Sequence, residues 1–336
     1  MLPANHKRYT QPAATDVRRL VFSSTGVGPT REVLPGERSV PGAGSGNQPS
    51  TTLSAVSAAL RFSAESLFAT LFPAECRICN SLLTNISRIP VCDFCRTRIK
   101  PFETLQCAIC GELLLSSHFA GFADPPAAPS TALCGLCQRA RPSYVKAVAR
   151  GPYEGVLRDL VHLLKYDRVQ SAAAILGEQL AIALGKVVAE SGPKTILIPV
   201  PLHASKLRVR GFNQAERIAA ATAKRLRVPI ELNSGILVRH RATDSQTGLT
   251  RHQRRQNIRG AFRVKPEMLH HIMRRNIILV DDVFTTGTTA EECSRVLLRA
   301  GAQHVWVATV ARVTKLEAAS MSLRGEFKPA GVAEHF

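Results

Sequence analysis

Apolar residues recur in two different rhythms along the middle and C-terminal parts of the chain. Over residues 154–166 and again over 172–190 they follow the spacing of a helix, which predicts two helices. Short aliphatic runs at 196–200, 277–280 and 304–309 predict strands, and the second run is typical of a strand buried on both faces. A helical pattern follows each of the first two strands. This alternation predicts an α/β fold in which helices cover a parallel sheet.

The most informative segment begins at Asn276 and carries polar chemistry directly after its strand. Asp281 and Asp282 stand at the C-terminal end of that strand, where two adjacent carboxylates can hold sugar hydroxyls or a metal. The loop that follows predicts a phosphate cradle at a helix N-terminus, because its glycine lets backbone N–H groups converge on an anion. Thr288 and Glu291 are spaced as a capping box. The alternative, an acidic surface turn, explains the Asp pair but not the whole pattern. The loop residues are Thr285, Thr286, Gly287, Thr288 and Thr289.

Eight of the nine cysteines fall into four pairs with two residues between the partners. This spacing lets both thiolates reach one tetrahedral metal, so four pairs predict two structural Cys₄ zinc sites, a double zinc ribbon. Redox or iron–sulfur chemistry and vestigial sites are the alternatives. Sequential pairing of the four units is the simpler arrangement, and interleaving stays open. The pairs are Cys76/Cys79, Cys92/Cys95, Cys107/Cys110 and Cys134/Cys137, whereas Cys293 is predicted to be a core residue.

A basic loop is predicted between the strand at 196–200 and the helix that follows it. Lys206, Arg208 and Arg210 supply charge-assisted donors for an anionic ligand, provided that this strand is a neighbour of the one that carries the Asp pair. Solvated surface cations are the alternative. His203 in the same loop is either a proton donor or an ordinary surface residue.

Positive charge is concentrated around this loop. The formal net charge is +19, and residues 203–263 contain fourteen Lys or Arg against three Asp or Glu. Clustering beside a predicted phosphate site favours an anionic partner, either a polyphosphate or a nucleic-acid backbone, over general solubility. The polar segment 243–262 is interpreted as a mobile lid over such a substrate, with a nucleic-acid contact and a plain linker as alternatives.

The segment from Val280 to Thr289 resembles the motif with which type I phosphoribosyltransferases bind 5-phosphoribosyl 1-pyrophosphate (PRPP). The resemblance implies that Asp281 and Asp282 hold the ribose hydroxyls and that Thr285–Thr289 bind the 5′-phosphate. Mg²⁺ is then expected to be held mainly by the substrate and by water. Lys206 and Arg210 are expected to offset the charge of the departing pyrophosphate.

A second resemblance, to the ComF family, covers roughly residues 76–312. It rests on the four cysteine pairs, the motif at 280–289, the spacing of residues within 246–262, and two short stretches, Val200-Pro201-Leu202-His203 and Arg210-Gly211-Phe212-Asn213-Gln214-Ala215. It implies a phosphoribosyltransferase-like protein with an N-terminal double zinc ribbon, linked to natural competence and DNA uptake. Single-stranded DNA and a helicase are the partners that it implies, and Val200, Pro201, Leu202 and His203 become candidate PRPP-binding residues.

The organisation that we expect has five segments. Residues 1–50 are predicted to be disordered, although an upstream start codon explains this tail equally well. An amphipathic helix is expected over 51–72, the double zinc ribbon over 73–142, the phosphoribosyltransferase-like domain over 143–315 and a tail over 316–336. We expect a cytoplasmic protein without a signal peptide or a membrane span, because no uninterrupted apolar run approaches the roughly 20 residues needed. Two functions stay open: phosphoribosyl transfer to an unidentified acceptor, or a non-catalytic DNA-uptake accessory that binds single-stranded DNA.

Overall fold

The computed structural model describes residues 74–83, 89–114, 132–243 and 251–314. The chain divides into two units, Met1–Leu53 and Ser54–Phe336, and every described residue belongs to the second. Three expectations therefore concern residues outside the described ranges: disorder over 1–50, a helix over 51–72 and a tail over 316–336.

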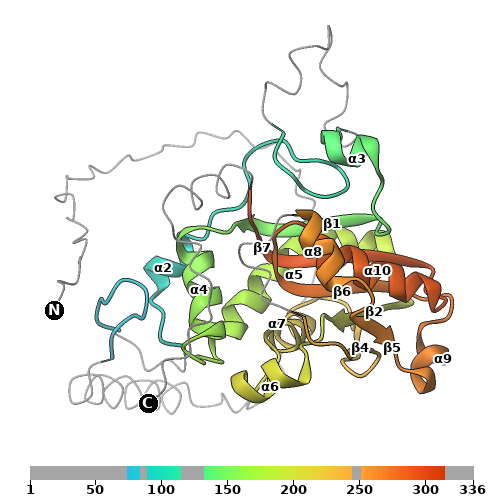
Figure 1. The fold of residues 1–336 in the computed structure, drawn as a ribbon. Helices are drawn as coiled ribbons and strands as arrows, with labels where there is room; N and C mark the ends of the chain where they lie inside the picture. Colours follow the sequence, from blue (N-terminus) through green and yellow to red (C-terminus); the bar gives the residue numbers. More distant parts are fainter. Residues whose placement is uncertain (1–73, 84–88, 115–131, 244–250, 315–336) are drawn as a thin grey trace, which may run out of the picture. The chain divides into compact units, whose positions relative to one another are not determined.

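A five-stranded parallel sheet forms the centre of the second unit (Figure 1). The strand order is β1-β7-β6-β2-β3, so the two strands that were expected to carry the ligand loops, β2 and β6, are direct neighbours. The aliphatic runs predicted as strands are confirmed as parts of this sheet. The strands are β1 (Lys146–Pro152), β2 (Thr195–Pro199), β3 (Glu231–Leu232), β6 (Asn276–Phe284) and β7 (His304–Arg312).

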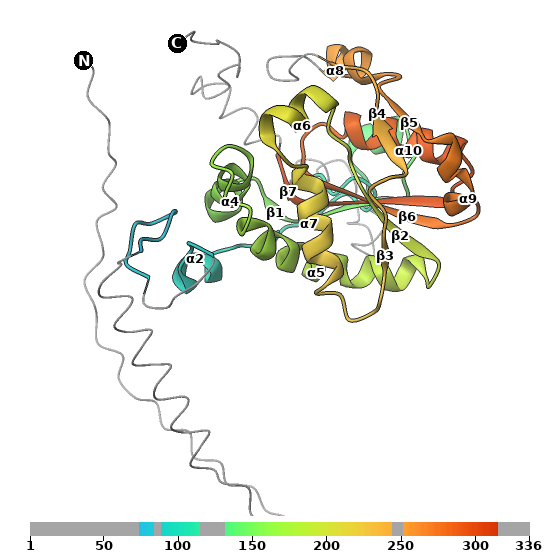
Figure 2. The same cartoon turned by 90° about the horizontal axis from the view of Figure 1, so that it is seen from below.

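Three helices cover one face of the sheet: α4 (Gly155–Lys165), α5 (Ala172–Ser191) and α7 (Gln214–Ala223) (Figure 2). Ile278 and Val280 of β6 point into this layer, where removing their aliphatic surface from water stabilises the fold. Helices α5 and α7 approach closely at Gly177, where a Cβ atom would lie only 2.4 Å from the Cβ of Ala221. Both helices predicted from the first periodic segments are thus confirmed.

Helix α5 is the one helix, within the described ranges, that is long and apolar enough to cross a bilayer. Its mean hydropathy comes from residues that pack into the core, among them the fully buried Leu176, Leu180 and Leu184. Burial against α4, α7 and the sheet accounts for the apolar character of α5.

The opposite face of the sheet is covered by α10 (Thr288–Arg299) and by a small antiparallel pair, β4 (Leu237–Arg239) with β5 (Phe262–Val264). Ile277 and Leu279 of β6 point into this second layer. Helix α8 (Arg251–Ile258) connects the paired strands, so the C-terminal half of the segment interpreted as a lid is helical. The short elements η2 (Pro266–Met268) and α9 (Leu269–Ile272) lead back to β6.

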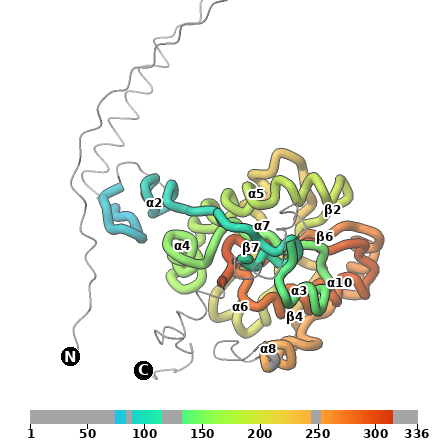
Figure 3. Tube along the Cα trace, turned by 90° about the horizontal axis from the view of Figure 1, so that it is seen from above, coloured from blue at the N-terminus to red at the C-terminus, as the bar shows by residue number. Residues whose placement is uncertain are grey.

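The cysteine-rich segment precedes β1 and contains two short helices, α2 (Asp93–Thr97) and α3 (Gly135–Arg139). In Figure 3, α2 lies beside α4, as it does in Figure 1. This contact involves Cys76, Cys95 and Ile99, which share a buried cluster with α4 and α5. Farther along the segment, the backbone N–H of Ala147 donates to the Ile109 carbonyl at 2.6 Å and joins the segment to β1. A parallel sheet with flanking helices, preceded by two Cys₄ clusters, confirms the predicted fold class.

Candidate functional site

The ends of β2 and β6 bring two loops to the same edge of the sheet. Pro199 is paired in register with Val280, and the next residue, Val200, donates its backbone N–H to the Val280 carbonyl at 2.8 Å. Proline has no N–H, and β3 pairs only with the first part of β2, so Pro199 lies where no further ladder bond is needed. The expectation that the 201–214 segment starts beside the Asp pair is confirmed.

The two carboxylates lie at the end of β6 and differ in their surroundings. Asp282 is buried, whereas Asp281 is partly exposed. The Oδ1 atom of Asp281 accepts a hydrogen bond from the backbone N–H of Asp282 at 2.8 Å. Burial and the neighbouring charge of Asp282 raise the pKa of Asp281 to about 7, so near neutral pH this carboxyl exchanges between its two protonation states.

Lys165 at the end of α4 completes this acid pair, and the sequence analysis did not identify it. Its Nζ atom lies 2.9 Å from Oδ2 of Asp282, and the exposed fractions of the two side chains are 17% and 7%. Burial acts to lower the pKa of Lys165, but the charge of Asp282 outweighs it and the net shift is upward. The sequence does contain a signal for this lysine. Leu157, Val161 and Lys165 follow one another at intervals of four positions, so Lys165 lies on the helix face that Leu157 and Val161 bury.

The threonine loop turns through Gly287, whose φ of +74° lies in the left-handed region. A Cβ atom at this position would lie 2.6 Å from Cζ of Phe284, so glycine is required both by the backbone and by the packing. The hydroxyls of Thr286 and Thr288 hydrogen-bond at 2.9 Å. Helix α10 starts at Thr288, so the loop leads directly into a helix N-terminus, as predicted.

The predicted capping box is wrong. Gly287, not Thr288, is the N-cap of α10, and Glu291 does not return to the helix end. Its carboxylate instead accepts hydrogen bonds from the N–H and the hydroxyl of Ser143, at 2.8 and 2.6 Å. This contact fastens the N-terminal half of α10 to the segment between α3 and β1.

The predicted basic loop after β2 is in fact the short helix α6 (Ala204–Arg210). His203 is its N-cap, with Nδ1 accepting from the Ser205 N–H at 3.3 Å, and Gly211 ends the helix with a φ of +80°. Arg210 donates to the Gln214 side chain at 2.6 Å. Lys206 is exposed, and partial desolvation together with the charges of Arg239 and Arg210 lowers its pKa.

Arg239 at the end of β4 is a further cation that the sequence analysis missed. Its backbone forms a parallel bridge with His203, and its guanidinium lies 5.5 Å from the ring centre of Phe262 and donates to Thr243. Desolvation lowers the pKa of Arg239, while the charge of Asp281 raises it in part. Arg239 therefore connects the acid pair electrostatically with Lys206. No local pattern marks it, because it depends on how β4 lies against the 201–214 segment.

The cysteines form two separate four-sulfur clusters, which confirms the sequential pairing. Within each cluster the Sγ atoms all lie within 4.8 Å of one another, so each can hold one metal ion. Four thiolates with no open position fit structural zinc. Cys293 lies on the buried face of α10 and belongs to neither cluster. The clusters are Cys76, Cys79, Cys92 and Cys95, and Cys107, Cys110, Cys134 and Cys137.

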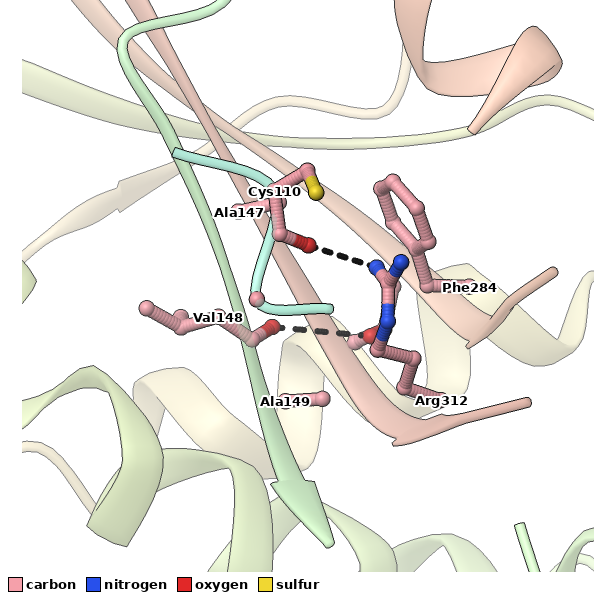
Figure 4. A pocket seen from close by; sticks show the side chains of 8 residues that line it. Cys110, Ala147, Val148, Ala149, Phe284 and Arg312 are labelled. Carbon is pink, nitrogen blue, oxygen red and sulfur yellow. Dashed lines mark hydrogen bonds between the residues drawn. The ribbon is translucent and has the colours of Figure 1, made fainter. Parts of the chain in front are cut away.

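The second cluster is joined to the sheet by Arg312, the last residue of β7. Figure 4 shows its guanidinium between the Cys110 carbonyl, to which it donates at 2.5 Å, and the ring of Phe284. The guanidinium carbon lies 4.4 Å from that ring centre, and Nη2 is paired with Glu112. Arg312 therefore connects the second cysteine cluster to Phe284, the residue against which Gly287 packs.

No family model matches the chain, but related proteins do. Competence protein F of Haemophilus influenzae is 31% identical over 243 residues, which cover 72% of this chain and 98% of that protein. The chain belongs to the ComF family. DNA utilization protein YhgH of Escherichia coli O157:H7 is likewise 30% identical to this ComF-family chain over 238 residues, covering 70% of it and 95% of that protein.

Among solved structures, a hypoxanthine phosphoribosyltransferase from Staphylococcus aureus is 13% identical to the ComF-family chain. The matched region covers 43% of this chain and 64% of the hypoxanthine phosphoribosyltransferase, with a TM-score of 0.26. The strand order and the helix layers define the fold, and ComF membership rests on the sequence relatives.

Proposed function

We propose that the edge of the sheet at β2 and β6 binds PRPP. The observation that carries this proposal is the parallel pairing of β2 with β6, because it gathers two carboxylates, a hydroxyl-rich loop and a basic helix at one edge. In open α/β sheets, ligands bind at the carboxyl ends of the strands. Each of these three groups suits one part of PRPP.

The ribose hydroxyls are assigned to Asp281 and Asp282, whose carboxylates accept hydrogen bonds from them. The 5′-phosphate is assigned to the residues 285–289 at the start of α10, where N–H groups and the helix dipole favour an anion. The pyrophosphate is assigned to Lys206, Arg210 and Arg239. The segment 200–203 forms the wall between these subsites, since it leaves β2 directly beside Val280.

The acid pair does not fit a directly bound Mg²⁺ well, because Asp282 is already ion-paired with Lys165 at 2.9 Å. Mg²⁺ prefers to keep several waters and to be held by phosphate oxygens. We therefore assign it to the pyrophosphate, and no protein residue is assigned as its ligand.

The reaction that follows from this arrangement is phosphoribosyl transfer. The bond between ribose C1 and the pyrophosphate oxygen breaks, a bond from C1 to the acceptor nucleophile forms, and the acceptor loses its proton. Cations near α6 stabilise the negative charge that develops on the pyrophosphate. The acceptor stays unidentified, and a screen of nucleobases for pyrophosphate release is the direct way to find it.

Titration calorimetry with PRPP and Mg²⁺ tests the binding proposal. Asp281→Asn and Thr286→Val are each expected to weaken binding roughly tenfold or more, because the first replaces a carboxylate acceptor by an amide donor and the second removes a hydroxyl that can bind the phosphate. Glu267→Gln is the matched control, since this exposed acid lies in η2. Absence of PRPP binding to the zinc-loaded wild-type protein would refute the proposal.

Single-stranded DNA is the second candidate ligand, and one observation favours it. Helices α6 and α8 contain no acidic residue, while Arg208 and Arg255 on them are exposed. Arg259 and Arg263 beyond α8 are exposed as well. Binding through such cations must weaken steeply with salt. Fluorescence anisotropy with a labelled oligonucleotide at rising salt measures this, with Arg255→Gln/Arg259→Gln expected to flatten the salt dependence. No binding at low ionic strength would exclude the DNA role.

The remaining expectations stay predictions. The family links the chain to competence and DNA utilization by the names of its relatives. A helicase partner and a cytoplasmic location are proposals of the same origin. Pull-down of a helicase by the zinc-loaded protein and fractionation of cells are their respective tests.

A further inference from the structure

Each carboxylate of the acid pair has one oxygen held by the protein and one oxygen left over. Oδ2 of Asp282 is paired with Lys165 at 2.9 Å, and Oδ1 of Asp281 accepts the Asp282 N–H at 2.8 Å. The other two oxygens make no hydrogen bond within the ranges that the structure describes. One remaining acceptor on each of two consecutive residues matches the two hydroxyl donors of a vicinal diol.

Lys165 supplies the positive charge that this arrangement needs. Two neighbouring carboxylates repel each other, and a buried carboxylate is costly unless it is paired. A divalent cation is one way to meet this need, since carboxylate pairs are common ligands of such ions. Here an ammonium group, itself only 17% exposed, occupies the position on Asp282.

The ammonium group is held in place by its helix. Lys165 is the last residue of α4, and Leu157 and Val161 on the same stripe are buried in the layer between α4, α5 and the sheet. The lysine head is therefore delivered from a packed element rather than from a loop. Such support keeps a polar group near its working geometry before any ligand arrives.

We propose that Lys165 is the built-in counter-ion of Asp281 and Asp282, and that it makes capture of a ribose 5-phosphate group independent of divalent cations. Lys165 acts through Asp282 and is a positioning residue: it occupies Oδ2 and leaves Oδ1 for a ribose hydroxyl. The inference rests on the proposed function, because it concerns the same site. Mg²⁺ then matters only for the pyrophosphate half of PRPP.

Calorimetry with ribose 5-phosphate tests this inference, because that probe lacks the pyrophosphate. The full-length, zinc-loaded protein is titrated in buffer freed of divalent cations by a chelating resin, with its zinc content measured afterwards, and again with Mg²⁺ added. The wild-type Kd is expected to change less than about threefold between the two conditions, because the lysine already fills the position a cation would take.

Variants of Lys165 supply the decisive comparison. Without Mg²⁺, Lys165→Met is expected to weaken binding by about tenfold or more, because Asp282 loses the charge-assisted contact that holds it for the ribose hydroxyl. Added Mg²⁺ is expected to restore part of the affinity. Lys165→Arg keeps the charge and is expected to remain independent of Mg²⁺. Lys224→Met is the matched control, because Lys224 is an exposed lysine at the end of α7. If Lys165→Met does not fold, as judged by circular dichroism, Lys165→Gln replaces it, since the amide can donate a hydrogen bond to Asp282 without carrying a charge.

Two results overturn the inference. The first is that the wild-type protein binds ribose 5-phosphate only when Mg²⁺ is present. The second is that an uncharged Lys165 variant binds ribose 5-phosphate as tightly as the wild type in the cation-free buffer. In both cases PRPP binding with Mg²⁺ still supports the proposed function. If neither ribose 5-phosphate nor PRPP binds under either condition, the proposed function itself fails.

Discussion

Nη2 of Arg312 lies 2.6 Å from Oε2 of Glu112, although the two residues are 200 positions apart. Both side chains are buried, and the guanidinium also contacts the Cys110 carbonyl and the Phe284 ring. The end of β7 is thus tied to the second Cys₄ cluster on one side and to the start of the threonine loop on the other. The second Cys₄ cluster and the segment that leads into the threonine loop thus both contact Arg312.

Breaking this ion pair should be costly. Glu112→Gln leaves the guanidinium buried without its counter-ion, and removing one partner of a buried pair typically costs about 3–5 kcal/mol of unfolding free energy. Urea unfolding measures the loss. Glu231→Gln provides the contrast, because its bridge to Arg275 is more exposed, with side-chain exposures of 39% and 28%, and such a pair contributes roughly 0–1 kcal/mol. Equal effects of the two changes would contradict the assignment.

The threonine loop should not tolerate a side chain at Gly287. Gly287→Ala combines a left-handed φ with a Cβ placed 2.6 Å from Phe284, so we expect the loop to shift and PRPP affinity to fall about tenfold or more. Adding Phe284→Leu should restore part of the affinity, because it removes the steric contact while the φ remains strained. Calorimetry of the single and double variants measures both effects. Wild-type affinity in Gly287→Ala would show that the loop geometry does not control the ligand.

Local signals in the sequence were enough for the main elements. Strands β2, β6 and β7 and the helices that cover the sheet follow from hydrophobic periodicity, whereas β1 and the two-residue β3 were not predicted. The cysteine clusters follow from two-residue spacing. Helix α6 escaped, because it has no buried residue and therefore no apolar stripe to reveal it. The sequence signals for this helix are confined to its two ends, where His203 is the N-cap and Gly211 is the left-handed C-cap.

The contacts that shape the candidate site were not predictable in the same way. Lys165 and Asp282 meet only because α4 packs beside the end of β6, and Glu291 is drawn from its expected capping role by Ser143, 148 positions away. Arg312 and Glu112 depend equally on how the cysteine-rich segment lies against β7. A single sequence carries no local signal for such pairs, since propensity and spacing describe neighbours along the chain.

The two Cys₄ clusters should affect the ligand site unequally. Metal analysis of the purified chain should give two zinc ions, and Cys134→Ser or Cys79→Ser should each remove one. We expect Cys134→Ser to weaken PRPP binding more than Cys79→Ser, because only the second cluster connects through Cys110 and Arg312 to Phe284. Cys293→Ser is the control for zinc content, since this buried cysteine belongs to neither cluster. Equal losses of PRPP affinity would argue against the Arg312 connection.

The ionisation of Asp281 should make stability depend on pH in a defined direction. Its pKa is raised from 3.8 to about 7, mainly by burial and then by Asp282, with the charges of Lys165 and Arg239 acting in the opposite sense. Below pH 3.8 the carboxyl is protonated in both states and has no effect. As pH rises toward 7, the unfolded chain loses this proton first, so folding becomes less favourable, and above pH 7 the full destabilisation is present. Asp281→Asn removes this pH-dependent destabilisation, because the amide does not ionise.

The melting temperature of Asp281→Asn relative to wild type should therefore increase between pH 5 and pH 7 and level off above pH 7, the upper limit set by the raised pKa. Differential scanning calorimetry across this range checks the trend, with Asp93→Asn as the control because Asp93 is an exposed acid in α2. A constant difference over the whole range would mean that Asp281 titrates alike in the folded and unfolded chain. The acid pair would then lack the electrostatic coupling on which both the diol assignment and the role of Lys165 depend.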